Sequence, residues 1–131
     1  MDKIIHKDLS YKIYGLLFDV HRELGHFRNE KQYGDYFEKL LKDSGIVHIR
    51  EYRFIDNQFG QEAVRCICDF IVDGKIIMEF KAKEFITKDD YKQVQRYLTT
   101  LNLELGIIVN FHQYRIYPKR VLNPSFRKKC S

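Results

Sequence analysis

The stretch "DGKIIMEFKAKEF", residues 73–85, predicts a turn followed by a strand, and the interpretation of the whole chain depends on it. Alternate side chains of a strand share a face. One face of this strand is apolar and suits a protein core, with Ile76, Met78, Phe80 and Ala82. The other face carries one apolar and three charged residues: Ile77, Glu79, Lys81 and Lys83. The pattern leaves open whether this second face points to water or into an active site.

The run just before it, "RCICDFIV", predicts a partner strand and contains an anomalous carboxylate, Asp69. Both faces of this strand are largely apolar, and a carboxylate buried there needs a partner or a cation. A two-residue hairpin loop would place Asp69 opposite Met78, on the wrong face for Glu79. A three-residue loop or a bulge would instead place it opposite Glu79. Gly74 can adopt the positive φ that such a loop needs.

Hydrophobic periodicity and turn signals divide the rest of the chain into helices and strands. The predicted helices lie within residues 9–24, 29–43 and 85–102, with Thr87 as the N-cap of the third. The predicted strands are 46–55, 63–72, one within 73–85, 105–111 and about 113–118; the turn-rich "DNQFGQ" separates the first two, and a basic tail ends the chain. This order predicts an α/β fold of the α+β sandwich type, in which helices flank a mixed sheet.

Length and composition favour a single domain over residues 1–131. A chain of 131 residues with 44% hydrophobic content can bury one core and is too short for two ordinary domains. The net charge of +5 favours polyanionic partners such as nucleic acid. The three cysteines show no metal-site spacing, which fits a reducing, cytoplasmic setting. No apolar run has the length of a signal peptide or of a membrane span, so no membrane association is expected.

Several motifs of the chain resemble those of a known protein superfamily. Asp69, nine intervening residues and then Glu79-x-Lys81 resemble the D-x(n)-E-x-K signature of the PD-(D/E)XK nuclease superfamily. Nearly the full length is similar to a small prokaryotic branch, the GxxExxY family, through "LSYKIYGLLFDVHRELG", "NEKQYGDYFEKLLKDSGI", "CDFIVDGKIIMEFKA" and "LELGIIVNF". Gln93-x-x-x-Tyr97 resembles the Q-x-x-x-Y motif of RecB-like members. One departure is Phe27, which stands where the GxxExxY pattern has glycine.

The resemblance implies a PD-(D/E)XK (restriction-endonuclease-like) core and a metal-dependent nuclease acting on phosphodiester bonds, with DNA favoured over RNA. It implies a Mg²⁺ or Mn²⁺ ion, for which oxygen ligands are suited. The implied metal ligands are Asp69, Glu79, Glu30 and the backbone carbonyl of Phe80. The implied catalytic residues are Asp69, Glu79, Lys81, Gln93 and Glu30, and the implied substrate-binding residues are Tyr97, Lys83 and Lys88. Because this chemistry needs both carboxylates on one face, we predict an odd loop or a bulge at residues 73–75.

Simpler interpretations of the same residues stay open. Glu79 and Lys81 suit a solvated strand face with cross-strand charge pairs. Glu30 suits a first-turn acid that interacts with helix amides, and Gln93 and Tyr97 suit an ordinary helix edge. The alternative function is a non-catalytic nucleic-acid-binding or protein-interaction module that retains a relic nuclease site, and a purely structural domain comes third. Strand preference and a homodimeric state are left open.

Overall fold

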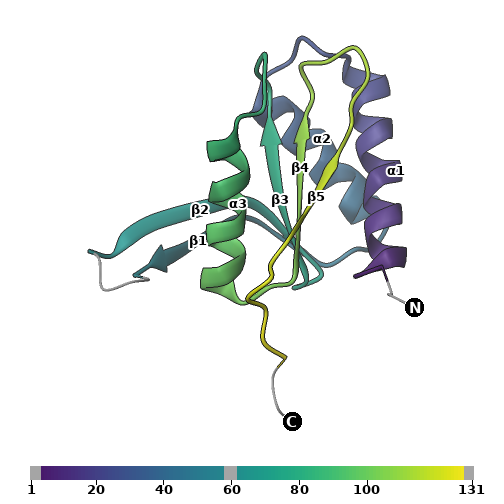
Figure 1. The fold of residues 1–131 in the computed structure, drawn as a ribbon. Coiled ribbons are helices and arrows are strands. Elements are labelled where there is room, and N and C mark those ends of the chain that lie inside the picture. Colours follow the sequence, from purple (N-terminus) through teal and green to yellow (C-terminus); the bar gives the residue numbers. More distant parts are fainter. Residues whose placement is uncertain (1–3, 58–61, 129–131) are drawn as a thin grey trace.

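The computed structural model describes residues 4–57 and 62–128 of the chain (Figure 1). Its helices are α1 (Lys7–Leu24), α2 (Glu30–Asp43) and α3 (Lys88–Leu101). Its strands are β1 (His48–Asp56), β2 (Val64–Val72), β3 (Ile76–Lys81), β4 (Leu105–Asn110) and β5 (Lys119–Leu122). The order of the elements is the predicted one. Most of the predicted turn "DNQFGQ" and the end of the basic tail lie outside the described residues, at 58–61 and 129–131.

The strands form one mixed sheet in the order β1-β2-β3-β4-β5. β1, β2 and β3 are antiparallel neighbours, β3 and β4 run parallel, and β5 is antiparallel to β4. A parallel pair needs a long crossover connection, and α3 supplies it between β3 and β4. The carboxyl ends of β3 and β4 therefore meet at one edge of the sheet, where Lys81 pairs with Asn110.

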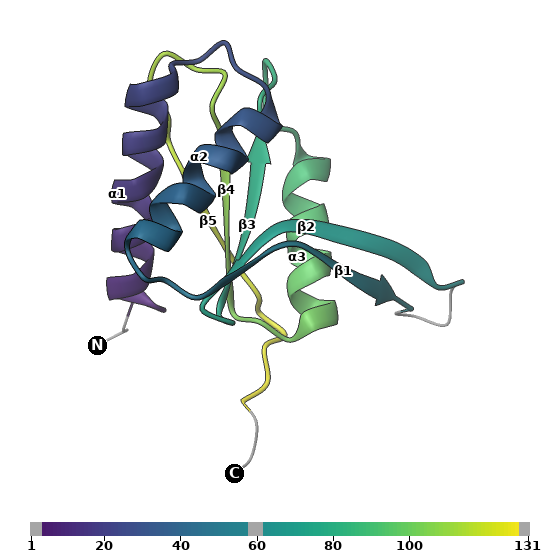
Figure 2. The same cartoon turned by 180° about the vertical axis from the view of Figure 1, so that it is seen from behind.

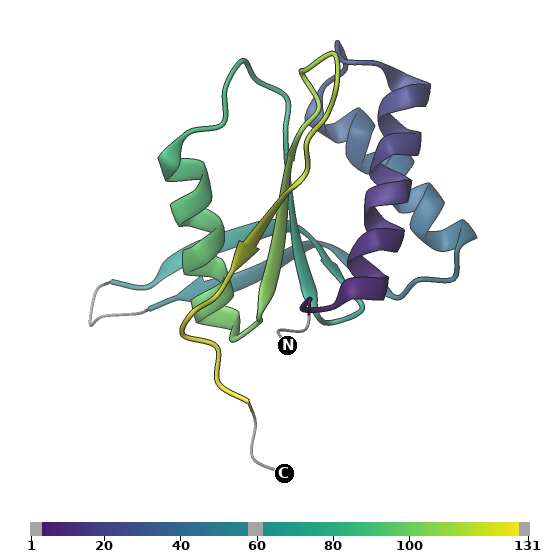
Figure 3. The same cartoon turned by 45° about the vertical axis from the view of Figure 1, so that its right-hand side comes forward.

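Helices cover both faces of the sheet (Figures 1, 2 and 3). Residues of α1 and α2, Phe37 among them, pack in one core cluster with Phe80 of β3. Residues of α3, Val94 among them, pack in a second cluster with Ile77 on the opposite face of β3. Glu79 shares the face of Ile77 and is only 5% exposed. The charged face of β3 therefore lies beneath α3 at this position and does not point into water.

Local sequence signals set the helix ends. Gly25 ends α1 with a φ of 76, a conformation that glycine adopts without steric cost. Asn29 begins α2 through a capping box with Gln32. Thr87 begins α3, as predicted, through a capping box with Asp90. Among the described helices, none combines the length and the apolar content that crossing a bilayer requires.

The last predicted strand is wrong in position. Residues 113–118 are not a strand, and β5 begins only at Lys119, after Pro118. Proline has no backbone N–H to donate to a strand ladder, so pairing with β4 starts behind it. The segment before it is a connection in which Ile116 alone is buried by the core, among the residues 113–118.

Candidate active site

The β2–β3 hairpin has the odd loop that aligns the two motif carboxylates. Val72 pairs with Ile76, which leaves residues 73–75 as a three-residue loop. The register continues along both strands as far as the last hydrogen-bonded pair. One residue further, it brings Asp69 opposite Glu79. The predicted odd loop at residues 73–75 is therefore confirmed.

Side chains replace the backbone ladder where β2 and β3 separate. The Phe80 N–H donates to Asp69 Oδ2 at 2.7 Å, and the Asp69 N–H donates to Glu79 Oε1 at 3.2 Å. One oxygen of each carboxylate thus accepts a hydrogen bond from a backbone N–H of the neighbouring strand, and its second oxygen takes no part in these two hydrogen bonds. The two carboxyl groups are held at one junction by the strands that carry them.

The strands separate where the β1–β2 ribbon turns away from the rest of the sheet (Figures 1 and 2). Glu51, which flanks this point on β1, has a φ of 53, which is uncommon for a strand residue. On one side of the turn Phe70 packs in the cluster of α1 and α2. On the other side Cys68 packs in the cluster of α3. Asp69 lies between them, at the boundary of the two layers.

Burial and mutual repulsion shift the titration of both carboxyl groups. Burial, and then the charge of Asp69, raise the pKa of Glu79 to about 8. Burial also raises the pKa of Asp69, although the hydrogen bond from the Phe80 amide opposes the shift. Two carboxylates confined together favour either a bound proton or a cation. Shifts of this kind concentrate at functional sites.

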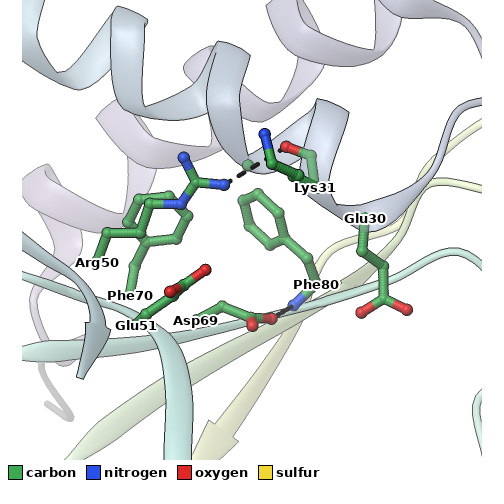
Figure 4. A pocket seen from close by; sticks show the side chains of 8 residues that line it. Glu30, Lys31, Arg50, Glu51, Asp69, Phe70 and Phe80 are labelled. Atoms are coloured by element: carbon green, nitrogen blue, oxygen red, sulfur yellow. Dashed lines mark hydrogen bonds between the residues drawn. The ribbon is translucent and has the colours of Figure 1, made fainter. Parts of the chain in front are cut away.

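A pocket of about 190 Å³ opens beside Asp69 (Figure 4). Its lining residues are Glu30, Lys31, Gly34, Arg50, Glu51, Asp69, Phe70 and Phe80. Glu30 enters it from the first position of α2, and partial burial, followed by the charge of Asp69, raises the pKa of Glu30. The structure thus brings Glu30 and Asp69 to one pocket. Glu79 is not among the lining residues, but its side chain accepts a hydrogen bond from the N–H of Asp69, which is one of them.

The two lysines of the charged face meet an acidic residue of α3. Lys83 Nζ lies 2.5 Å from Asp90 Oδ2, and Lys81 Nζ lies 3.9 Å from Asp90 Oδ1. Burial alone would raise the pKa of Asp90, but hydrogen bonds from Lys83 and from the Thr87 amide hold it below its usual value. The first turn of α3 therefore positions both ammonium groups on the side of the sheet that carries Glu79.

Three further predicted residues lie along α3. Lys88 is exposed in the first turn, and Gln93 is half-buried one turn later. Tyr97 is only 5% exposed, and its ring meets the ring of Phe54 edge-on at a centroid distance of 4.9 Å. Burial, and then the charge of Glu79, raise the pKa of Tyr97 to about 12. The structure thus places Tyr97 in the core near Glu79, where its ring offers almost no surface to a substrate.

Comparison with known proteins shows to which family the chain belongs. A sequence model described as the PD-(D/E)XK nuclease superfamily matches residues 7–121, from the start of α1 into β5. This chain belongs to the PD-(D/E)XK nuclease superfamily. The predicted fold class, a mixed sheet flanked by helices on a PD-(D/E)XK core, is confirmed.

Among solved structures, this superfamily member resembles the crystal structure of SSO0001, with a TM-score of 0.53 and 18% sequence identity. The match covers 86% of this chain and 66% of that one, so this chain spans about two thirds of the length of SSO0001. At this identity the likeness concerns the fold alone. No curated protein matches the chain.

The sequence analysis did not identify Arg50, which lines this PD-(D/E)XK pocket. Arg50 Nη1 donates to Asp35 Oδ1 at 2.6 Å, and the guanidinium lies 5.6 Å from the centroid of the Phe70 ring. Gly34 provides the space, because a Cβ there would lie 2.8 Å from Arg50 Nη2. Figure 4 shows Arg50 and Lys31 along one side of the pocket and Asp69 on the other. The available signal was weak: Arg50 is half-buried, whereas Ile49 and Glu51 beside it on the strand are exposed.

A second missed residue is Asn110, at the carboxyl end of β4. It is 4% exposed, and its side chain donates to the Lys83 carbonyl at 2.7 Å and accepts from the Lys83 N–H at 3.2 Å. The same oxygen accepts from the His112 N–H at 3.2 Å. Asn110 therefore ties together the segments that follow β3 and β4. The signal was a polar residue that ends an apolar strand at the edge where the parallel strands finish.

The oxygen donors at this junction fit a hard divalent cation. Mg²⁺ and Mn²⁺ prefer carboxylate and carbonyl oxygens, the donor types of Asp69, Glu79, Glu30 and the Phe80 backbone. Within residues 4–57 and 62–128, no three or more His, Cys, Asp or Glu side chains are already gathered as a cation site. Glu30 would therefore have to approach the Asp69–Glu79 pair to complete the ligand set.

Proposed function

We propose that this protein is a metal-dependent nuclease of the GxxExxY type that hydrolyses phosphodiester bonds, with DNA as its substrate. The observation that carries the proposal is the junction of Asp69 and Glu79, with Lys81 two residues along the same strand face. Membership of the PD-(D/E)XK nuclease superfamily supports it. The net charge of +5 also suits a polyanionic substrate. We further propose that residues 1–131 form one domain that works in the cytoplasm.

In this proposal Asp69, Glu79 and the Phe80 carbonyl hold Mg²⁺ or Mn²⁺, and Glu30 completes or orients the ligand set. When bound, the cation lowers the pKa of a coordinated water and offsets negative charge on the phosphate. Glu79, whose pKa is raised to about 8, would have to release a proton to solvent in order to serve as a ligand. Arg50 and Lys31 lie on the opposite wall of the pocket, and both are paired with Asp35, at 2.6 and 2.8 Å, so an entering phosphate would compete with this carboxylate for them.

Lys81 has a distinct task. Its ammonium group donates hydrogen bonds to the attacking water and to the phosphate oxygens, which stabilises the charge that develops in the transition state. Asp90 restrains this ammonium group, with 3.9 Å between the charged atoms. Gln93, half-buried on α3, orients the water, the lysine or a phosphate through its amide. An ammonium group cannot be a metal ligand. Removing Lys81 should therefore abolish cleavage without affecting cation binding.

The remaining predicted residues take supporting parts. Lys83 and Lys88 contact phosphates away from the cleaved bond, where their charges release counterions. Tyr97 supports Glu79 from within the core, in keeping with its 5% exposure, and has no direct contact with the substrate. The homodimeric state is a separate question that the cleavage proposal does not require.

The test combines cation binding and cleavage in four variants. Asp69→Asn and Glu79→Gln should lose Mn²⁺ binding by calorimetric titration and lose cleavage of single-stranded, duplex and branched DNA. Lys81→Met should keep Mn²⁺ binding and lose cleavage by roughly a hundredfold or more, the usual cost of removing a transition-state donor. Glu84→Gln is the matched control, because this exposed carboxylate follows the same strand.

Two outcomes would reject the nuclease assignment. One is cleavage by Glu79→Gln at the wild-type rate, and the other is a wild-type protein that binds no divalent cation at millimolar concentration. In the second case, nucleic-acid binding without cleavage would leave the non-catalytic module with a relic site as the better description. An RNA oligonucleotide cleaved faster than DNA would correct the substrate and keep the mechanism.

A further inference from the structure

Four aromatic side chains gather on two connections beside the candidate active site. His26 and Phe27 follow α1, and His112 and Tyr114 follow β4. The centroid distances are 4.0 Å between His26 and Phe27, 6.2 Å between Phe27 and His112, and 6.1 Å between His26 and Tyr114. Figure 3 shows the two connections side by side above the sheet, and Figures 1 and 2 agree. We call these four side chains the aromatic platform.

The aromatic platform is exposed to an unusual degree. Phe27 is 81% exposed and Tyr114 is 80% exposed. The hydrophobic effect opposes the exposure of such rings, and clustered exposed apolar groups mark interaction sites. Phe27 also stands where the GxxExxY pattern has glycine, so its ring is a feature of this chain that the general pattern does not require.

The backbone beneath the aromatic platform is held in place. The Tyr33 hydroxyl donates to the Gly25 carbonyl at 2.6 Å and accepts from the Arg28 N–H at 3.2 Å. His21 Nε2 lies 2.7 Å from the Gln113 carbonyl oxygen, next to His112. Anchors therefore flank the exposed rings on both connections. The rings are presented on fixed backbone, which lowers the entropic cost of binding a ligand.

A hollow of about 410 Å³ joins the aromatic platform to the candidate active site. Phe27, Arg28, Glu30 and His112 are among its lining residues. Glu30 also lines the pocket that contains Asp69. A single carboxylate therefore forms the boundary between the rings and the proposed cleavage site. Arg28 is exposed in this hollow and offers a cation to a phosphate group.

We propose that the aromatic platform stacks the unpaired bases of a nucleic-acid strand whose backbone continues into the Asp69–Glu79 site, which makes single strands and unpaired ends the preferred substrate. Aromatic rings that stack bases and cations that follow the phosphates are the general means of binding single strands. Bases inside a continuous duplex already stack on one another and cannot reach an exposed ring. The path into the cleavage site rests on the proposed nuclease function, whereas base stacking on Phe27 does not.

The first experiment reports on the platform directly. The chain contains no tryptophan, so Phe27→Trp introduces a single tryptophan at the exposed ring, and its emission can be excited separately from that of the tyrosines. Titration with a 12-nucleotide oligothymidylate in EDTA, where no cleavage occurs, should quench its emission saturably. A blunt duplex of equal length should quench it far less. Tyr11→Trp is the matched control, because this exposed aromatic lies on α1 about 20 Å from Leu24 at a rise of 1.5 Å per residue.

The second experiment measures affinity without a reporter in the protein. In EDTA, Phe27→Ala should weaken binding of the same fluorescently labelled oligonucleotide by roughly tenfold, the usual effect of losing one stacked base. Phe27→Tyr should retain the affinity because it keeps a ring, and Tyr11→Ala should not change it. The exposed position makes all three substitutions compatible with folding, which circular dichroism verifies.

The outcomes separate this inference from the nuclease proposal. Wild-type affinity in Phe27→Ala, equal quenching by blunt duplex, or no oligonucleotide binding at all would overturn the platform, even if the protein cleaves DNA. Weaker binding in Phe27→Ala would uphold it, even if the wild type cleaves nothing. A Phe27→Trp emission that changes with protein concentration alone would show that the rings pair two copies of the chain, and this would also overturn it.

Discussion

At the scale of single residues, Glu79 is a carboxylate placed in an apolar layer. Its neighbours in that layer include Ile77 and Ile108, and it is 5% exposed. A charge in such a place is costly unless a partner or a cation compensates it. The Asp69 N–H donates one hydrogen bond to Glu79, while the Asp69 carboxylate repels its charge. The proposed cation would remove this conflict.

This conflict predicts a pH-dependent stability in the absence of metal. Burial, and then Asp69, raise the pKa of Glu79 from 4.5 to about 8, so between these values the folded protein binds more protons than the unfolded chain. The free energy of unfolding must then fall as the pH rises through this window. Glu79→Gln removes the effect, and in EDTA at pH 8.5 it should exceed the wild type by on the order of 2 kcal/mol, a difference that shrinks towards pH 4.5.

Urea denaturation at both pH values measures this difference. Glu23→Gln, at an exposed carboxylate of α1, is the control and should show no such pH dependence. Equal stability of Glu79→Gln and wild type at pH 8.5 would contradict the burial argument. Added Mn²⁺ should stabilise the wild type and leave the Gln variant unchanged, because binding to the folded state alone shifts the unfolding equilibrium.

Single-residue chemistry was only partly predictable from the sequence. Asp69 and Glu79 stood out because carboxylates are rare within apolar strands. The role of Asp90 was not predictable, since its contacts with Lys81 and Lys83 depend on how α3 packs on β3. Contacts between residues distant in sequence leave no local pattern. The roles of Arg50 and Asn110 were not predicted for the same reason.

At the scale of elements, the hydrophobic periodicity and the capping residues were sufficient to predict where most helices and strands lie. The three helices and β1 to β4 lie where period and caps placed them, and Gly74 has the positive φ, 62, that the hairpin loop needs. The strand predicted at about 113–118 was misplaced, because residue types favourable to a strand do not reveal which strand they would pair with. The lateral partner of β5 is β4, and the pairing residues begin at Lys119.

Close packing of α3 on β4 predicts a specific sensitivity. A Cβ at Gly106 would lie 2.6 Å from Val94 Cγ1, and Val94 is fully buried. Gly106→Ala should therefore destabilise the protein by about 1–3 kcal/mol through overpacking. Val94→Ala in the same chain should recover part of the loss, so the two changes should couple in a double-mutant cycle. Thermal or urea denaturation of the four proteins measures this.

The control for this change is Gly15→Ala in α1. A Cβ at Gly15 meets no atom within 4 Å, so this substitution should stabilise the helix by about 0.5–1 kcal/mol. A Gly106→Ala protein as stable as the wild type would show that α3 can move outward without cost. In that case the spacing between α3 and β4 would not be fixed by this contact.

At the scale of the whole molecule, the proposed function requires a polyanion to bind at the edge where β3 and β4 end. Lys83 and Lys88 lie near the carboxyl end of β3, whereas Lys75 lies before its first residue, at the opposite end. Affinity for single-stranded DNA should fall linearly with salt on a double logarithmic plot. Lys88→Ala should reduce the slope by about one, and Lys75→Ala should leave it unchanged. Anisotropy titrations between 50 and 300 mM salt, roughly the range over which such slopes are resolved, test this; equal slopes in both variants would contradict the assigned edge.

The central claim, that Asp69 and Glu79 form a cation site, is tested most directly by locating Mn²⁺ in a crystal through its anomalous scattering. The account predicts a peak at about 2.0–2.3 Å from one oxygen of each carboxylate, with the Phe80 carbonyl as a further ligand. The same crystal form of Glu79→Gln should show no such peak. Saturating Mn²⁺ that leaves no peak between Asp69 and Glu79 in the wild type, with both carboxylates still bound to the backbone amides, would contradict the account.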